Sequence, residues 1–121
     1  MGASQQRKGA AGERELAALL RQYGYDIQRG GFVFGTVPDL VGLPGIHIEV
    51  KRAEQCRILD WMSQSKADAE KFKDGMPIVV WRKNHGEWIV IQPFSDWIQI
   101  YNNSDYPDNR RCDGGQDNTS D

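Results

Sequence analysis

Hydrophobic residues recur with helical spacing in three segments of the chain. In residues 9–23, three leucines and a tyrosine lie at i, i+3, i+4 and i+7, which places them on one face of a helix. Residues 57–73 carry a second apolar stripe, and residues 94–101 predict a short last helix. On the second helix we expect the buried residues to be Ile58, Met62, Ala69 and Phe72.

Between the helices the pattern changes to the alternation of apolar and polar residues that is typical of β-strands. Residues 39–43 and 46–52 flank a Leu-Pro-Gly-Ile turn and predict an antiparallel pair. A short strand is expected before Gly30, and two more at 77–83 and 87–93. The predicted order is α-β-β-β-α-β-β-α. Because strands lie on either side of the second helix, we expect a crossover and an α/β fold, a mixed sheet flanked by helices.

The length of 121 residues suits one domain with one core. Residues 1–8 are polar and predict a flexible basic arm, residues 9–101 the folded domain, and residues 102–121 an acidic tail with little to bury, which we expect to be disordered. The chain has no apolar run of about 18 residues and no secretory signal at its start, so we expect a cytoplasmic protein that does not bind membranes. The two cysteines do not have zinc-ligand spacing.

The net charge of the chain limits the classes of function to consider. The chain carries a net charge of −2, but residues 102–121 contain five Asp and two Arg, so the tail carries −3 and the rest +1. A nearly neutral body lacks the strongly basic surface that many nucleic-acid-binding domains show. DNA binding must therefore be argued from a specific site.

One such site is suggested by residues 36–52. Glu49 and Lys51 are two apart on a predicted strand and so share a face, and the turn brings Asp39 close to them. Two neighbouring carboxylates repel each other unless a cation lies between them, and Mg²⁺ prefers such oxygen ligands. A lysine beside them can stabilise charge that develops on a phosphate. The competing interpretation is the solvent-facing side of an ordinary hairpin.

Two further residues bear on this site. Glu13 lies on or beside the apolar face of the first helix, where a carboxylate needs a partner, although a glutamate in a first turn is also favoured by the helix dipole. His47 shares the strand face of Glu49 and could serve as a general base, but an ordinary strand residue is the favoured interpretation.

The segments RKGAAGERELAALLRQYGYDIQR, PDLVG and IEVKR, followed by a helix that carries a glutamine, resemble archaeal-type Holliday junction resolvases and their phage-borne relatives. These belong to the PD-(D/E)XK nuclease superfamily, named after the Pro-Asp…(Asp/Glu)-x-Lys signature. The resemblance covers residues 7 to about 92. It implies a restriction-endonuclease-like sheet and a Mg²⁺- or Mn²⁺-dependent endonuclease that processes phage or mobile-element DNA in a bacterial, archaeal or phage-infected cell.

The resemblance also implies roles for matching residues. Asp39 and Glu49 would be the main metal ligands, with Glu13 and the Val50 carbonyl as further ones. Lys51 would position the attacking water. The remaining implied residues are Gln64, a helix residue near the catalytic site, and the DNA-binding residues Arg7, Lys8 and Arg52.

One departure from the resolvases concerns the loop before Pro38. It is shortened to GGFVFGT, residues 30–36, with Thr36 as its only hydroxyl. Because this loop bears on junction recognition, three hypotheses stay open: a homodimeric enzyme that cuts four-way or other branched DNA, a nicking or restriction-like endonuclease without junction preference, and an inactive nuclease fold that binds DNA.

Overall fold

The computed structural model describes residues 2–30 and 37–106, with side chains from residue 9 onward. Three helices and five strands follow the predicted order. Their bounds are α1 Gly2–Gln22, β1 Gln28–Arg29, β2 Leu40–Val41, β3 Ile46–Arg52, α2 Ile58–Phe72, β4 Met76–Arg82, β5 Ile89–Ile91 and α3 Phe94–Asn103.

The strands form one mixed sheet in the order β1-β2-β3-β4-β5. The pairs β1–β2, β2–β3 and β4–β5 are antiparallel. The central pair β3–β4 is parallel, because the chain returns through the crossover helix α2. The predicted α/β class with a restriction-endonuclease-like mixed sheet is confirmed.

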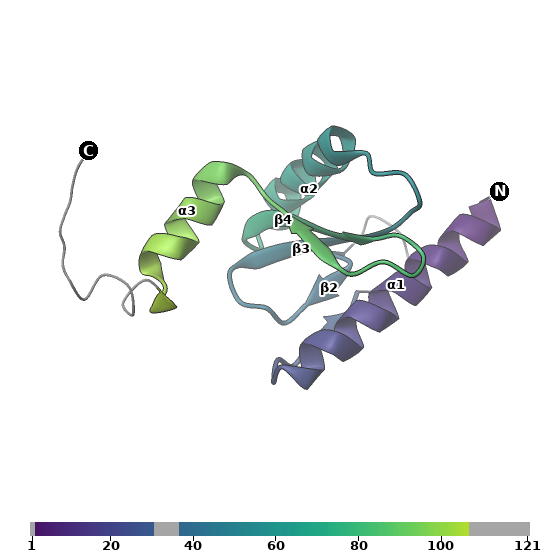
Figure 1. Cartoon of the computed structure of the whole chain (residues 1–121), viewed down its shortest axis with the longest axis horizontal. Helices are drawn as coiled ribbons and strands as arrows, with labels where there is room; N and C mark the ends of the chain where they lie inside the picture. The colour runs from purple at the N-terminus through teal and green to yellow at the C-terminus, as the bar shows by residue number, and fades with distance from the viewer. Residues whose placement is uncertain (1, 31–36, 107–121) are drawn as a thin grey trace.

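Helices α1 and α2 cover opposite faces of the sheet (Figure 1). One face packs on α1 and forms the apolar core, which consists of Leu16, Ala17, Ile27, Leu40, Ile48, Val50, Ile78 and Val80. Gly12 allows the close approach of α1, since a Cβ there would lie 2.6 Å from Cγ of Arg52. The other face contacts α2, where Trp61 packs against Trp81. β3 is therefore covered on both sides, and the solvent-facing hairpin is excluded.

The burial of α2 agrees in part with the prediction. Ala69 is buried as expected, and Met62 and Phe72 are half-buried, whereas Ile58 is 46% exposed. Trp61 and Ser65, which the apolar stripe did not include, are also buried. Ser65 is polar, but its hydroxyl donates a hydrogen bond of 2.9 Å to the carbonyl of Ile78 and can therefore be buried.

The ends of the folded region also differ from the prediction. Helix α1 begins at Gly2, so the expected loose arm is helical from that residue, and α3 continues to Asn103. The rest of the expected tail, residues 107–121, and most of the GGFVFGT loop, residues 31–36, lie outside the described residues. Within the described part, no helix is long and apolar enough to cross a membrane.

Candidate active site

The pairing of β2 with β3 positions the first acidic residue. Leu40 pairs with Ile48, and continuing this register by one residue sets Asp39 opposite Glu49 on the same face of the sheet. The Asp39 carboxylate accepts a hydrogen bond of 2.9 Å from the Val50 N–H, and its backbone carbonyl accepts one from Gly30. Asp39 is thus fixed at both its side chain and its backbone.

A small cavity of about 120 Å³ lies on this face, between β3 and α2. Four of the five predicted catalytic residues line it: Asp39, Glu49, Lys51 and Gln64. The other lining residues are Val37, Pro38, His47, Asp68 and Phe72. The structure therefore brings together, in one cavity, residues that are up to 35 positions apart in the sequence.

Glu49 lies at the centre of the polar contacts in this cavity and is only 5% exposed. Its Oε2 lies 3.7 Å from the Lys51 ammonium, and its Oε1 lies 3.5 Å from Nε2 of His47. The Lys51 ammonium also donates a hydrogen bond of 3.0 Å to Oε1 of Gln64. The lysine is thus held between a strand carboxylate and a helix amide.

The cavity concentrates negative charge. Burial and, to a smaller extent, the charge of Glu49 raise the pKa of Asp39 to about 7, although the hydrogen bond from Val50 acts in the opposite direction. Burial and the same glutamate also raise the pKa of Asp68. Buried carboxylates such as these repel one another when they are ionised, and a cation between them removes the repulsion. Their oxygens are the ligands that Mg²⁺ and Mn²⁺ take, so the residues present fit such an ion.

Glu13 lies near this site but is bound elsewhere. Its carboxylate accepts hydrogen bonds of 3.2 and 3.3 Å from the guanidinium of Arg29, and it is not among the residues that line the cavity. Burial raises its pKa, and Arg29 partly offsets the rise. Because the charge of Glu49 also acts on it, Glu13 belongs to the surroundings of the site. Its role as a metal ligand stays a prediction, as does that of the Val50 carbonyl.

The predicted DNA-binding residues are less closely connected to the cavity. Arg52 donates hydrogen bonds to the carboxylate of Glu15 at 2.9 and 3.0 Å and to Asn84 at 2.7 Å, which links α1 to the end of β4. The side chains of Arg7 and Lys8 lie outside the described residues, although their backbone belongs to α1. Contact of these three residues with DNA stays a prediction.

Three residues of the site were missed or underrated at the sequence level. His47 is 1% exposed, and its Nδ1 lies 3.0 Å from both carboxylate oxygens of Asp74. Burial alone would lower the pKa of His47, but Glu49 and Asp74 outweigh it and raise the pKa. Asp68 lies one turn after Gln64 on α2, and this i, i+4 spacing was the available signal.

A parallel central strand pair with a crossover helix agrees with the fold of PD-(D/E)XK nucleases, and one cavity gathers Asp39, Glu49 and Lys51. Sequence comparison agrees with this class. The sequence model of a family described as "Phage putative PDDEXK endonuclease" matches residues 4–111, and the chain belongs to that family. Membership of the superfamily is thereby confirmed, and it supports a nuclease function. A search of curated proteins found no match.

Proposed function

We propose that the protein is a metal-dependent DNA endonuclease that hydrolyses phosphodiester bonds, with a preference for branched DNA. The observation that carries this proposal is the cavity in which Asp39, Glu49, Lys51 and Gln64 meet. Two carboxylates supply oxygen ligands for a divalent cation, and a fixed ammonium lies beside them. This combination suits the hydrolysis of a phosphodiester.

Each residue has a distinct part in this proposal. Asp39 and Glu49 hold Mg²⁺ or Mn²⁺, and the bound cation supplies charge stabilisation and a more acidic water. The Lys51 ammonium faces the phosphate and offsets the negative charge that develops on it. Gln64 holds this ammonium through its hydrogen bond of 3.0 Å, so the amine does not collapse fully onto Glu49.

The preference for branched DNA rests on the sequence resemblance to junction resolvases. The net charge does not distinguish the two alternatives, because a nearly neutral body gives little general attraction to DNA of either shape. The alternative, a nicking or restriction-like enzyme, shares the same chemistry and differs only in the DNA it accepts.

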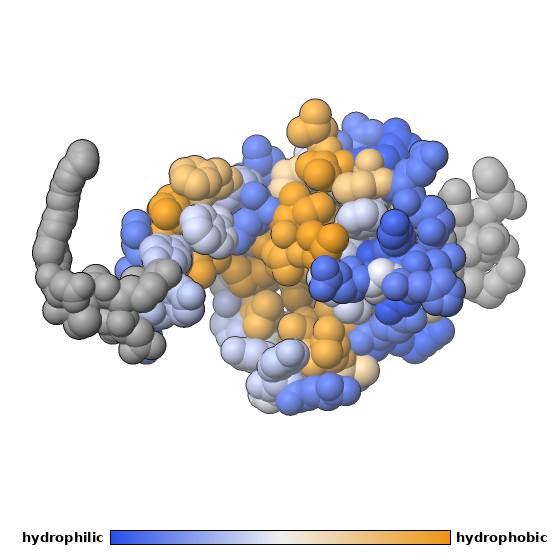
Figure 2. All heavy atoms as spheres, in the orientation of Figure 1, coloured by the Kyte–Doolittle hydropathy of each residue, from blue (hydrophilic) through white to orange (hydrophobic). Residues whose placement is uncertain are grey.

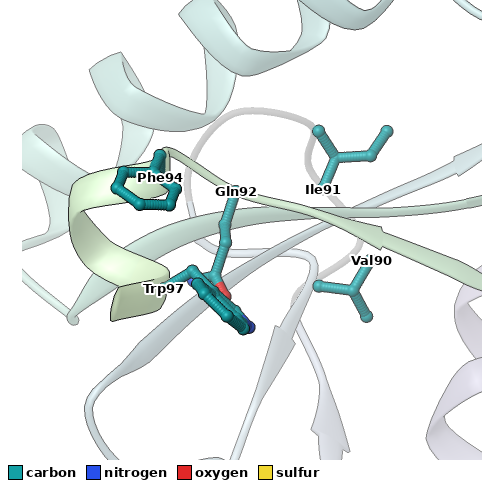
Figure 3. A pocket seen from close by; sticks show the side chains of 5 residues that line it. All are labelled: Val90, Ile91, Gln92, Phe94 and Trp97. Carbon is teal, nitrogen blue, oxygen red and sulfur yellow. The ribbon is translucent and has the colours of Figure 1, made fainter. Parts of the chain in front are cut away.

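A homodimer is the form that fits paired cuts, because two symmetric cuts require two sites. An apolar pocket of about 470 Å³ is available for this contact at the sheet edge, lined by Val90, Ile91, Gln92, Phe94 and Trp97 (Figure 3). Helix α3 extends from the body and has no buried residue (Figure 1). Hydrophobic side chains gather on the face that carries β5 and α3 (Figure 2).

The occupant of this pocket is a second copy of the chain. An amphipathic helix of 10 residues is only marginally stable without tertiary packing, and Phe94 is 73% and Trp97 45% exposed. Of the four tryptophans, Trp97 is the one whose side chain is exposed, since Trp61 is buried and Trp88 packs against the core. A twofold contact of α3 and β5 with their copies would cover these side chains.

Cleavage assays test the proposal. The purified protein is incubated with labelled four-way junctions, flaps, linear duplex and single strands, with and without Mg²⁺ or Mn²⁺. We expect metal-dependent, paired cuts in branched DNA. Equal cleavage of linear duplex would favour the restriction-like alternative, and the absence of cleavage on every substrate would favour a DNA-binding module.

Two variants test whether the cavity is the active site. Glu49→Gln should abolish cleavage, whereas Glu70→Gln, which removes an exposed carboxylate on α2, should cleave like the wild type. If both variants cleave equally well, the assignment of the active site is wrong.

A further inference from the structure

The cavity contains a second group of potential ligands beside the predicted residues. His47, Glu49 and Asp68 each offer one ligand atom, and these atoms all lie within 4.8 Å of one another. Glu49 belongs to both groups, but through different oxygens. Its Oε2 faces Lys51 at 3.7 Å, and its Oε1 faces His47 at 3.5 Å. The two sides of one carboxylate thus face two different environments.

The His47 ring is fixed on its other side. Its Nδ1 lies 3.0 Å from both oxygens of Asp74, and the ring stacks on Phe72 with centroids 6.3 Å apart. Because a carboxylate accepts hydrogen bonds, Nδ1 must be the donor, which leaves Nε2 to face the cavity. Among the described residues, Nε2 makes no well-formed hydrogen bond, since its contact with Oε1 of Glu49 is 3.5 Å long, although His47 is only 1% exposed. Such an orphaned buried nitrogen requires an explanation.

This arrangement is the one found around metal-bound histidines. A histidine that binds a metal through one nitrogen almost always donates its other N–H to a carboxylate or carbonyl, which fixes the ring and raises its basicity. Here Asp74 provides that carboxylate. The remaining two ligands are the buried carboxylate of Glu49 and the half-buried carboxylate of Asp68, which lie close enough to share one cation.

We infer that His47 Nε2, Glu49 and Asp68 bind a divalent transition-metal ion, with Asp74 as the residue that orients the histidine. The inference deepens the proposed function, since Glu49 is shared with the Asp39 site. An imidazole nitrogen favours transition-metal ions over Mg²⁺, which prefers oxygen ligands alone, and this advantage is smaller for Mn²⁺ than for Co²⁺ or Zn²⁺. The site therefore gives the protein a preference for Mn²⁺ over Mg²⁺ that Asp39 and Glu49 alone would not provide.

A different explanation for His47 is a ring that carries both protons and links Asp74 to Glu49 without any metal. In that case the ring itself would supply the positive charge, and neither Mn²⁺ affinity nor a metal spectrum would depend on it. Metal binding measured in the absence of DNA separates the two explanations.

The experiment uses the full chain after treatment with a chelator. Mn²⁺ and Mg²⁺ binding are measured by titration calorimetry, and the visible absorption of bound Co²⁺ reports nitrogen ligation. We expect His47→Gln to weaken Mn²⁺ binding by about 10- to 100-fold and to change the Co²⁺ spectrum. Mg²⁺ binding should weaken by no more than about threefold, because it does not depend on the imidazole.

Asp68→Asn is a second variant for the case in which His47→Gln does not fold. Asp68 is only half-buried on α2, so its substitution should disturb the fold less. It should also weaken Mn²⁺ binding about tenfold. Its matched control is Asp60→Asn, which removes an exposed carboxylate from the same helix and should bind Mn²⁺ like the wild type. Asp74→Asn should weaken Mn²⁺ binding by a similar factor, because the ring loses its orientation.

The outcomes separate this inference from the proposed function. If folded His47→Gln and Asp68→Asn bind Mn²⁺ as tightly as the wild type, the inference is overturned whatever the nuclease assays show. If Mn²⁺ binding depends on His47 while the wild type cleaves no DNA, the metal site stands and the proposed nuclease activity fails.

Discussion

The polar cavity between β3 and α2 and the apolar cavity at β5 and α3 differ in size, lining and place in the fold. The cavity between β3 and α2 measures about 120 Å³, and its nine lining residues include three acidic residues, a lysine and a histidine. The cavity at β5 and α3 measures about 470 Å³ and has four apolar side chains and one glutamine, with no charged residue. The difference indicates two separate roles. Charged side chains in a small buried space can bind ions, whereas an open apolar surface can bind another apolar surface.

The two cavities also depend on different parts of the chain. The polar cavity lies at the parallel pair in the middle of the sheet, where both faces are covered and side chains are fixed by packing. The apolar cavity lies at an edge strand and a helix without buried residues. If this division is correct, substitutions in one cavity should leave the property assigned to the other unchanged.

The largest expected effect is that of Lys51→Ala on cleavage. Loss of the ammonium removes a fixed positive charge from the place where the phosphate becomes more negative, and we expect the cleavage rate to fall by about 10²- to 10³-fold. The measurement is single-turnover cleavage of the best substrate with saturating Mg²⁺. Lys66→Ala, which removes an exposed lysine of α2, is the matched control. A Lys51→Ala rate within a few-fold of the control would remove Lys51 from the mechanism.

The next effect concerns the stability of the metal-free protein. Because the pKa of Asp39 is raised from 3.8 to about 7, the folded state holds its proton more tightly than the unfolded state. The stabilisation from this group is complete below about pH 4 and is lost as the pH rises to about 7. Each unit of pKa corresponds to about 1.4 kcal/mol, so the loss amounts to a few kcal/mol at most.

Urea unfolding with a chelator at several pH values measures this loss. Asp39→Asn should flatten the decline between pH 4 and 7, because asparagine does not titrate. Asp60→Asn removes an exposed carboxyl group and controls for the general effect of one acidic residue fewer. A wild-type decline that persists unchanged in Asp39→Asn would show that another group causes it.

The apolar cavity predicts an effect on association. Trp97→Ala should weaken the homodimer by about 30-fold, since aromatic residues at the centre of an interface contribute about 2 kcal/mol or more. Sedimentation equilibrium measures the dissociation constant, and Leu59→Ala, which shortens a residue of α2 that is also exposed, is the control. A wild type that is monomeric at all concentrations would refute the dimer. Metal binding should be the same in both variants.

How much of this could be predicted from the sequence differs between strands and helices. The alternation in residues 46–52 and the turn before them were sufficient to predict that β2 pairs with β3 and that Asp39 lies close to Glu49, because a hairpin turn limits the register of its strands. The parallel pairing of β3 with β4 also followed from the helix between them. These relationships are local, or are limited by the handedness of crossovers.

The burial of Ser65 on α2 could not be predicted in this way. Hydrophobicity ranks Ser65 as a surface residue, and it is buried because the carbonyl of Ile78 accepts its hydrogen bond. Asp74 likewise reaches His47 only because the chain turns back into β4. Such contacts join distant segments through a single hydrogen bond, so the local pattern of hydrophobic and polar residues does not reveal them.

The smallest effect is expected for Gln64→Ala, and it tests how the polar cavity holds its lysine. Gln64 is exposed, and its contribution is a single hydrogen bond of 3.0 Å to the Lys51 ammonium. A bond of this kind contributes about 1 kcal/mol, so cleavage should slow by about fivefold. Gln55→Ala, an exposed glutamine before α2, is the control. In Lys51→Ala, the further change Gln64→Ala should have no effect, because the bond is already lost. An equal loss in both backgrounds would mean that Gln64 acts on the substrate directly.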